Sequence, residues 1–492
     1  MPNNEAATSL MGADILNLIT TGMYHTPLAV YREYIQNAAD AIKGSPKRDE
    51  GRVEISIDAG QRKVTIRDNG PGLTHAQAKR DLIPIAHSRK RRGVDRGFRG
   101  IGRLSGLAFA EAVTFRTRSR ATQAVTEIRW DGATLRASVI GGEDPREIIE
   151  KCVNVSKAEE GGWPDHFFEV EIEQVARHAA NRILNRDAVR RYIGEVGPVP
   201  MCEEFPFREE IEALFEDRHQ PLTLEVTINA EEEPVRRRHG AALKFSEERT
   251  GAFVELEPVR VPAPDCAKDA AIGWIAHSSY LGAIPKDLGI RGIRLREGNI
   301  QIGDENALDT LFREERFNRW CVGEIHVVDA RLLPNGRRDY FEPGPHMRQI
   351  ENHLESIIQS VVHRCRNASA VRNQQRKVQT TLDHMDSAYE LAGSGYLKAA
   401  DAKTLIEKMM EKVQTLEESL DPTDPDHENK ATEIERLRAK LSQFRPKRGR
   451  PPMGKVRKAE IATYQRVFKA LTELCPSPSV AKEMIEGVLG RA

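Results

Sequence analysis

The sequence predicts an α+β protein in three successive parts: a mixed α/β part, a strand-rich α/β part and a helical part. Residues 1–185 alternate helical segments with period-two strand segments and glycine turns. Residues 210–345 contain strand-like runs at 222–228, 252–261, 293–302 and 323–333. Glycine then becomes scarce, and residues 346–444 follow a helical apolar periodicity. We therefore expect two α/β domains followed by a helical, coiled-coil region.

The amino-acid composition excludes some classes of protein but does not indicate a binding partner. The 492 residues are 39% hydrophobic and 30% charged, which excludes collagen-like and wholly disordered chains. Lys+Arg and Asp+Glu are equal at 74 each, so bulk charge predicts no partner. No apolar run reaches membrane-spanning length, the N-terminal residues lack the basic start and long apolar stretch of a signal peptide, and six cysteines form no CxxC. We expect a cytoplasmic protein, associated with the nucleoid in a bacterium or located in the nucleus in a eukaryote.

The first predicted helix has two chemically different faces. It is expected to begin at the Thr26-Pro27 signal and to stop at Gly44. One arc of a helical wheel carries the apolar residues Leu28, Tyr31, Ile35, Ala38, Ala39 and Ile42. The opposite arc carries Glu33, Asn37 and Asp40. A carboxylate and an amide at i and i+4 lie about 6 Å apart and could hold a water and a hydrated metal ion. Taken alone, the pattern favours an ordinary solvated face.

The second motif is a strand that ends in an acid. Residues 52–58 and 62–68 read as two strands joined by a turn, and Asp68 shares the inward parity of Val64 and Ile66. A buried carboxylate is costly unless it accepts hydrogen bonds, and the exocyclic amino group of a base is a suitable donor. Gly70 and Gly72 follow and allow a sharp turn close to a ligand. A plain turn with an aspartate cap is the alternative.

The third motif is the glycine-rich, basic segment at 86–106, with a GxxGxG formed by Gly97, Gly100 and Gly102. A glycine-rich turn that opens a helix exposes backbone amides to phosphate. The segment lacks the preceding strand of a dinucleotide-binding motif and the GK[ST] of a P-loop. In isolation it could equally be a flexible basic loop.

Together, the three motifs resemble the GHKL ATPase superfamily, which includes DNA gyrase B, MutL, the ninety-kilodalton heat-shock chaperone, histidine kinases and MORC proteins. The resemblance implies a Bergerat-type α/β sandwich over residues 1–185 that binds ATP and Mg²⁺. It implies that Glu33 is the general base, that Asn37 coordinates Mg²⁺ and that Asp68 accepts from adenine. The further ATP-binding residues that it implies are Asp40, Gly70, Gly72, Ser88, Gly97, Gly100, Ile101 and Gly102. The threonine that the family places on a later strand has no clear equivalent in 166–175.

The middle part, 210–345, resembles the transducer domain that follows GHKL modules. In such relatives a Lys or Arg just after a strand reaches back to the γ-phosphate. The run 323–343 offers Arg337 as the first choice for this catalytic role and Arg338 as the second. A surface arginine pair in a turn is the alternative.

Two heptad-like runs mark the helical part. Met409, Val413, Leu416 and Leu420 form the first, and Ile434, Leu437, Leu441 and Phe444 form the second, around a Pro-containing break at 421–426. They are typical both of a coiled coil that joins two protomers and of amphipathic helices packed within one chain.

A basic segment at 445–458 comes next, and then a small helical tail at 459–492. The core of the basic segment, Lys447, Arg448, Gly449 and Arg450, resembles an AT-hook, in which arginines enter a narrow A·T-rich minor groove. A solubilising linker or an import signal is the alternative. The leading hypothesis from sequence is thus an ATP-operated homodimeric clamp on double-stranded DNA, and the competing one is a chaperone-like ATPase with protein clients.

Overall fold

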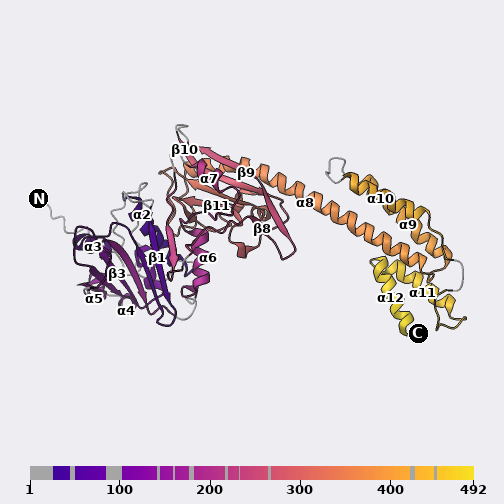
Figure 1. Ribbon diagram of the computed structural model, residues 1–492, viewed down its shortest axis with the longest axis horizontal. Coiled ribbons are helices and arrows are strands. Elements are labelled where there is room, and N and C mark those ends of the chain that lie inside the picture. The colour runs from indigo at the N-terminus through magenta and orange to yellow at the C-terminus, as the bar shows by residue number, and fades with distance from the viewer. Residues whose placement is uncertain are drawn as a thin grey trace. The chain divides into compact units, whose positions relative to one another are not determined.

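The computed structural model confirms the α+β class, with a sheet-containing N-terminal part and a helical C-terminal part (Figure 1). It describes residues 26–44, 50–84, 102–140, 145–158, 161–176, 182–215, 220–231, 233–263, 268–420, 427–447 and 451–491. Two compact units divide the chain at residues 365 and 366. Ser88, Gly97, Gly100, Ile101, Arg448, Gly449 and Arg450 lie outside the described residues.

The first unit begins with a seven-stranded sheet in the order β5-β4-β3-β6-β2-β1-β7. Its strands are β1 (Arg52–Asp58), β2 (Lys63–Asp68), β3 (Ala112–Arg118), β4 (Thr126–Asp131), β5 (Val153–Lys157), β6 (Phe167–Glu173) and β7 (Glu225–Ile228). The helical segments among them are α2 (Ala29–Lys43), α3 (His75–Leu82), the 3-10 helix η3 (Gly102–Ala108), α4 (Gly132–Ile140), α5 (Pro145–Cys152), α6 (Arg186–Val196) and α7 (Arg208–Leu214).

This sheet has one apolar and one charged face. Val64, Ile66, Phe115 and Val170 are buried on one side, in the same core as residues of α2. On the other side Arg116 pairs with Glu127, Glu169 and Glu171 at 2.7, 3.1 and 3.0 Å. Period-two alternation therefore yields a single sheet with helices packed on one face and an ion-pair network on the other.

The first helix differs from its predicted start. α2 begins at Ala29, and its N-cap, Leu28, makes no side-chain capping bond. The Ala29 and Val30 amides donate to the Thr26 and Pro27 carbonyls at 3.1 and 3.4 Å, so a tight turn occupies the segment that was expected to start the helix. Gly44 ends the helix as predicted.

The strand predicted at 222–228 belongs to the first sheet and not to the middle domain. β7 pairs in parallel with β1, with Val53 opposite Val226. The helix α6 also packs on α2, and its Val189 and Ile193 lie in the first core. The N-terminal domain therefore extends past the predicted boundary at 185, because a strand far along the chain completes its sheet.

The middle part is built on a six-stranded sheet in the order β12-β11-β13-β10-β9-β8. Its strands are β8 (Ala242–Lys244), β9 (Thr250–Pro262), β10 (Asp269–Ser278), β11 (Gly292–Glu297), β12 (Ile300–Ile302) and β13 (Val322–Val327). Short 3-10 turns lie at Lys286–Leu288, Asp309–Leu311 and Glu315–Trp320. β10 was not predicted because all of its residues but one are buried, so it shows no alternation.

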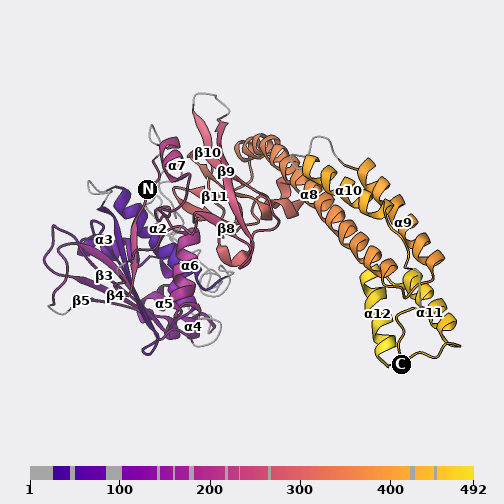
Figure 2. The same cartoon turned by 45° about the vertical axis from the view of Figure 1, so that its right-hand side comes forward.

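Five helices form the rest of the structure: α8 (Pro345–Gly393), α9 (Ala399–Glu418), α10 (His427–Ser442), α11 (Ile461–Leu474) and α12 (Pro478–Arg491). Figure 2 shows α9 and α10 beside α8, and α11 beside α12. Among the described residues, no helix combines the length and the apolar character needed to cross a membrane.

The two heptad-like runs pack against each other inside the second unit. Met409, Val413 and Leu416 share one buried cluster with Ile434, Leu437, Leu441 and Phe444. Met453, Val456, Phe468 and Ile485 belong to the same cluster, so the predicted linker and tail are parts of this unit rather than separate domains. The structure thus favours packing within the chain over a coiled-coil seam between protomers.

Candidate nucleotide site

Glu33 is buried despite its place on the polar face of α2. The residue is only 7% exposed, because η3 covers this side of the helix. A side chain at Gly102 would overlap the Glu33 carboxylate, so the end of the glycine motif lies directly on that acid. Arg32 Nη2 lies 3.2 Å from Glu33 Oε1. The solvated-face alternative is therefore wrong for Glu33, whereas Asn37 and Asp40 are half-buried further along the helix.

Tyr34 fixes the position of η3 over Glu33. Its hydroxyl donates to the Arg103 carbonyl at 2.9 Å and accepts from the Gly106 amide at 3.1 Å. Because Tyr34 follows Glu33 directly, the same helical turn carries the acid and holds the segment that covers it. No sequence signal distinguished this tyrosine from the apolar arc in which it lies.

Of the two candidate arginines, Arg338 reaches the acid. Its Nε lies 3.9 Å from Glu33 Oε1, and the residue is 9% exposed. Its Nη1 is buried and has no hydrogen-bond partner among the described residues. Arg338 lies in the loop after β13 and has a left-handed φ of 56°. Arg337, the first choice from sequence, is exposed.

Asp68 lies at the end of β2, buried as its parity predicts. Its Oδ1 accepts the Gly70 amide at 2.8 Å. Burial raises the pKa of Asp68 to about 7, and the Gly70 hydrogen bond acts in the opposite direction. A Cβ at Gly70 would lie 2.6 Å from Asp68 Oδ1, so glycine is required for this tight turn.

Gly72 shapes the loop by close backbone packing. It has a φ of 65°, and a side chain there would overlap the Arg118 carbonyl. The next residue, Leu73, donates its amide to Thr117 Oγ1 at 2.9 Å, and Thr117 Oγ1 donates to the Phe167 carbonyl at 2.9 Å. Gly72 therefore positions the loop after Asp68.

Comparison with known proteins identifies the family that the N-terminal part matches. Residues 25–161 match the family of histidine kinase-, DNA gyrase B- and HSP90-like ATPases. The N-terminal domain is a GHKL-type domain.

Curated relatives match part of the chain. The chaperone protein HtpG of Psychrobacter arcticus is 24% identical over 228 residues, which cover 41% of this chain and 32% of the relative. HtpG of Cronobacter sakazakii is 28% identical over 220 residues, 40% of this chain and 32% of the relative. HtpG of Yersinia pestis is 31% identical over 142 residues, 24% of this chain and 23% of the relative. The chain thus spans about a third or less of the length of these relatives.

Besides Tyr34, two residues that contact the loop after Asp68 were not predicted from the sequence. Thr117 on β3 is buried and pairs with Phe168, which in turn pairs with Asp68 on the far side of β6. The three side chains therefore share one face of the sheet. His166 Nδ1 lies 2.7 Å from the Gly70 carbonyl. The family resemblance implied a threonine within 166–175, the segment that contains β6. In the structure a buried threonine, Thr117, lies on the neighbouring strand β3 instead.

The donor set suits a hard cation that is held mainly by phosphate and water. Asn37 and Glu33 offer amide and carboxylate oxygens, and Mg²⁺ takes few protein ligands of this kind. Within the described ranges, no cluster of three or more His, Cys, Asp or Glu forms a metal cage. Asn37 would hold the ion, which would neutralise charge on the phosphates when bound.

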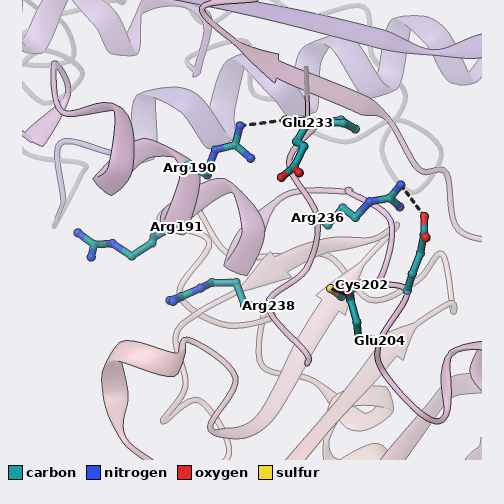
Figure 3. Close-up of a pocket in the computed structure, with 9 residues that line it drawn as sticks. Arg190, Arg191, Cys202, Glu204, Glu233, Arg236 and Arg238 are labelled. Atoms are coloured by element: carbon teal, nitrogen blue, oxygen red, sulfur yellow. Dashed lines mark hydrogen bonds and ion pairs between the residues drawn. The ribbon is translucent and has the colours of Figure 1, made fainter. Parts of the chain in front are cut away.

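A separate cleft of about 610 Å³ lies outside the GHKL site (Figure 3). Arginines line it, but Arg190 donates to the Glu233 carbonyl at 2.9 Å, and Arg236 pairs with Glu203 at 2.9 Å. Arg238 donates to the Asp287 carbonyl at 2.6 Å. Protein oxygens accept hydrogen bonds from these three arginines, and none of the GHKL motif residues lines the cleft, so we do not place the triphosphate there.

The pKa of Asp68 gives a prediction for the nucleotide-free GHKL domain. The folded state raises this pKa from 3.8 to about 7, so between these values it binds more protons than the unfolded chain. The free energy of unfolding should then fall with rising pH by up to about 1.4 kcal/mol per unit through this window, and level off above it. Urea unfolding from pH 4 to 8 should show this slope in the difference between wild type and Asp68→Asn. A flat difference would contradict the burial of an ionisable group here.

Proposed function

We propose that the chain hydrolyses ATP and that the phosphates lie between α2 and the loop after β13. The observation that carries the proposal is the approach of Arg338 to Glu33, since it brings a cation from the middle part to the acid of the GHKL domain. Glu33 would orient and deprotonate the attacking water, and Asp68 would accept from the adenine amino group. Such catalysis needs positioning and charge compensation, with little covalent work by the protein.

Arg338 would couple the nucleotide state to the position of the middle part. Its buried Nη1, which has no partner among the described residues, would donate to a γ-phosphate oxygen. ATP would stabilise the arrangement in which this contact forms, and ADP would not. The same loop places Arg337 in solvent, so it has no part in this coupling.

Replacing Arg338 by alanine should therefore lower kcat by roughly 10²- to 10³-fold with little loss of ATP affinity, because an arginine at the γ-phosphate acts mainly in the transition state. Steady-state turnover and calorimetric binding of a non-hydrolysable ATP analogue measure the two effects. Arg337→Ala is the matched control and should turn over like wild type. Equal loss in both variants would contradict the assignment of Arg338.

We infer that proteins are the clients of this ATPase. The relatives that support this inference are named chaperones, and the similarity extends to about 40% of this chain. The DNA clamp is the second candidate. Support for it comes from the basic segment 445–458, in which Lys447 is exposed, while Met453 and Val456 pack on the helical unit.

Turnover against two kinds of substrate separates the candidates. An unfolded protein client should raise the ATPase rate at least about twofold, whereas A·T-rich duplex DNA should not, because a single short basic motif binds weakly and loses affinity with salt. A variant with Lys447, Arg448 and Arg450 changed to alanine should respond to clients like wild type. DNA stimulation that disappears in this variant would establish the clamp instead.

We also propose that the active form is a homodimer. The rate per chain should rise with protein concentration over the range in which dimers form. The heptad-like runs are buried within the second unit, so another surface would join the protomers.

A further inference from the structure

The side chain of His166 holds the turn that follows Asp68. The pairing of β2 with β6 ends with Asp68 opposite Phe168, so the same register continued would place Gly70 opposite His166. Here the imidazole reaches across, and His166 Nδ1 lies 2.7 Å from the Gly70 carbonyl oxygen. The N–H of Gly70 donates to Asp68 Oδ1 at 2.8 Å. Gly70 is therefore held on one side by the histidine and on the other by the buried acid.

The two ring nitrogens of His166 have opposite roles. A carbonyl oxygen only accepts hydrogen bonds, so Nδ1 carries a proton and donates it to Gly70. Arg120 Nη2 lies 2.8 Å from His166 Nε2, and because a guanidinium only donates, Nε2 carries no proton. The two neighbours thus select one neutral tautomer of the ring. The other neutral tautomer would direct a bare nitrogen at the Gly70 carbonyl and an N–H at the Arg120 guanidinium.

The segment that carries His166 is itself fixed in place. Arg118 Nε donates to the Pro164 carbonyl at 2.8 Å, and Arg118 Nη2 donates to the Trp163 carbonyl at 2.6 Å. The Trp163 ring stacks on Phe167, with centroids 5.4 Å apart and an angle of 4° between the planes. Contacts on both sides of His166 therefore limit the movement of its ring, as a residue that positions another requires.

The turn after Asp68 needs such a contact because of its own sequence. Residues 69–72 read Asn-Gly-Pro-Gly, and glycine has more backbone freedom than any other residue. Asp68 is only 6% exposed. If Gly70 moved away, the Asp68 carboxylate would lose a hydrogen bond in a buried place, which is costly. The imidazole therefore opposes a movement that the two glycines would otherwise allow.

We propose that His166 is a positioning residue for the nucleotide: its Nδ1–H fixes Gly70, and Gly70 fixes the Asp68 carboxylate that the adenine amino group meets. The inference rests on the proposed ATP site and adds to it a residue outside the GHKL motifs. The hydrogen bonds of His166 lead to Asp68, whereas the hydrolytic step depends on Glu33 and Arg338. Loss of the Nδ1–H should therefore weaken ATP binding and leave kcat at saturating ATP unchanged.

Three variants separate the N–H from the bulk of the ring. In His166→Asn the amide nitrogen is bonded to Cγ, as Nδ1 is in histidine, so it can still donate to Gly70. In His166→Gln the amide lies one carbon further out, nearer the position of Nε2. We expect His166→Ala and His166→Gln to raise the Kd and KM for ATP at least about fivefold, as for one lost hydrogen bond, and His166→Asn to stay within about twofold of wild type. In all three variants kcat should stay within about twofold of wild type.

The matched control is His75→Ala. His75 is an exposed histidine of the same domain, and its Nδ1 lies 3.2 Å from Thr126 Oγ1. This variant should bind and hydrolyse ATP like wild type. Calorimetric titration with ATP and steady-state turnover measure Kd, KM and kcat for the full chain and each variant.

The tautomer can be measured without nucleotide. In the full chain labelled with ¹⁵N-histidine, the ring resonances that disappear in His166→Asn belong to His166, one of 14 histidines. The ¹⁵N shift distinguishes a protonated ring nitrogen from a bare one, and we expect a protonated Nδ1 and a bare Nε2. A bare Nδ1 in the wild-type chain would overturn the proposal whatever the variants do.

Two binding results would also overturn it. One is an unchanged Kd for ATP in His166→Ala. The other is equal weakening in His166→Asn and His166→Gln, as expected if the ring only fills space. Absence of ATP binding by the wild-type chain would instead remove the proposed function, and the wild-type titration shows this before any variant is compared.

Discussion

Glu33→Gln should abolish ATP turnover while leaving ATP binding nearly intact. The amide keeps the size of the carboxylate under η3 but cannot take a proton from water, so we expect kcat to fall by roughly 10²- to 10⁴-fold. Two neighbours surround the Glu33 carboxyl. Gly102 packs against it so closely that a side chain there would overlap it, and Arg338 Nε lies 3.9 Å from Glu33 Oε1. Phosphate release and calorimetric ATP binding measure the two properties in the same preparation.

The matched control for this experiment is Glu54→Gln. Glu54 is an exposed glutamate on β1, within the same domain, and its loss should leave turnover unchanged. If Glu33→Gln turned over ATP at the wild-type rate, another group would have to activate water, and the proposed mechanism would fail.

Asp68→Asn should remove nucleotide binding itself. An asparagine at the end of β2 can direct N–H donors at the adenine amino group, so two donors would face each other in a buried place. Unpaired buried polar groups of this kind cost on the order of 3 kcal/mol, which corresponds to at least about a 100-fold rise in Kd. Calorimetry with ATP, and with GTP as a purine that lacks the amino group at this position, measures the loss and its specificity.

Asp165→Asn controls for the change of charge, because the Asp165 side chain is fully exposed. It should bind ATP like wild type. Thermal unfolding of Asp68→Asn without nucleotide separates lost binding from lost folding, and here the variant should be at least as stable as wild type above pH 7. ATP bound by Asp68→Asn with unchanged Kd would place adenine elsewhere.

Local sequence patterns predicted the burial of a residue correctly where that burial depends only on the strand that contains the residue. The parity of β2 predicted that Asp68 is buried, and the structure confirms it. The motif order predicted the GHKL domain, and the family match over 25–161 confirms it. A helical wheel treated Glu33 as solvated, because a wheel describes one helix and cannot represent η3, which begins 69 residues later along the chain.

Two adjacent arginines show most clearly what the sequence pattern could not predict. Arg337 and Arg338 are chemically identical in the sequence, and only the fold of the loop that carries them shows that Arg338 is the one that meets Glu33. The heptad-like runs around residues 405–444 look the same whether their partner helix is in this chain or another. Their burial with α8 residues such as Met385 and Leu391 answers that question within the second unit.

The sequence by itself determined the order of the parts, the GHKL motifs and the inward-pointing acid of β2, because these depend on residue types at short, fixed spacings. Only the tertiary structure decided which arginine approaches Glu33 and that β7 completes the first sheet. Those facts depend on contacts between residues far apart along the chain, and such contacts leave no periodic trace in the sequence.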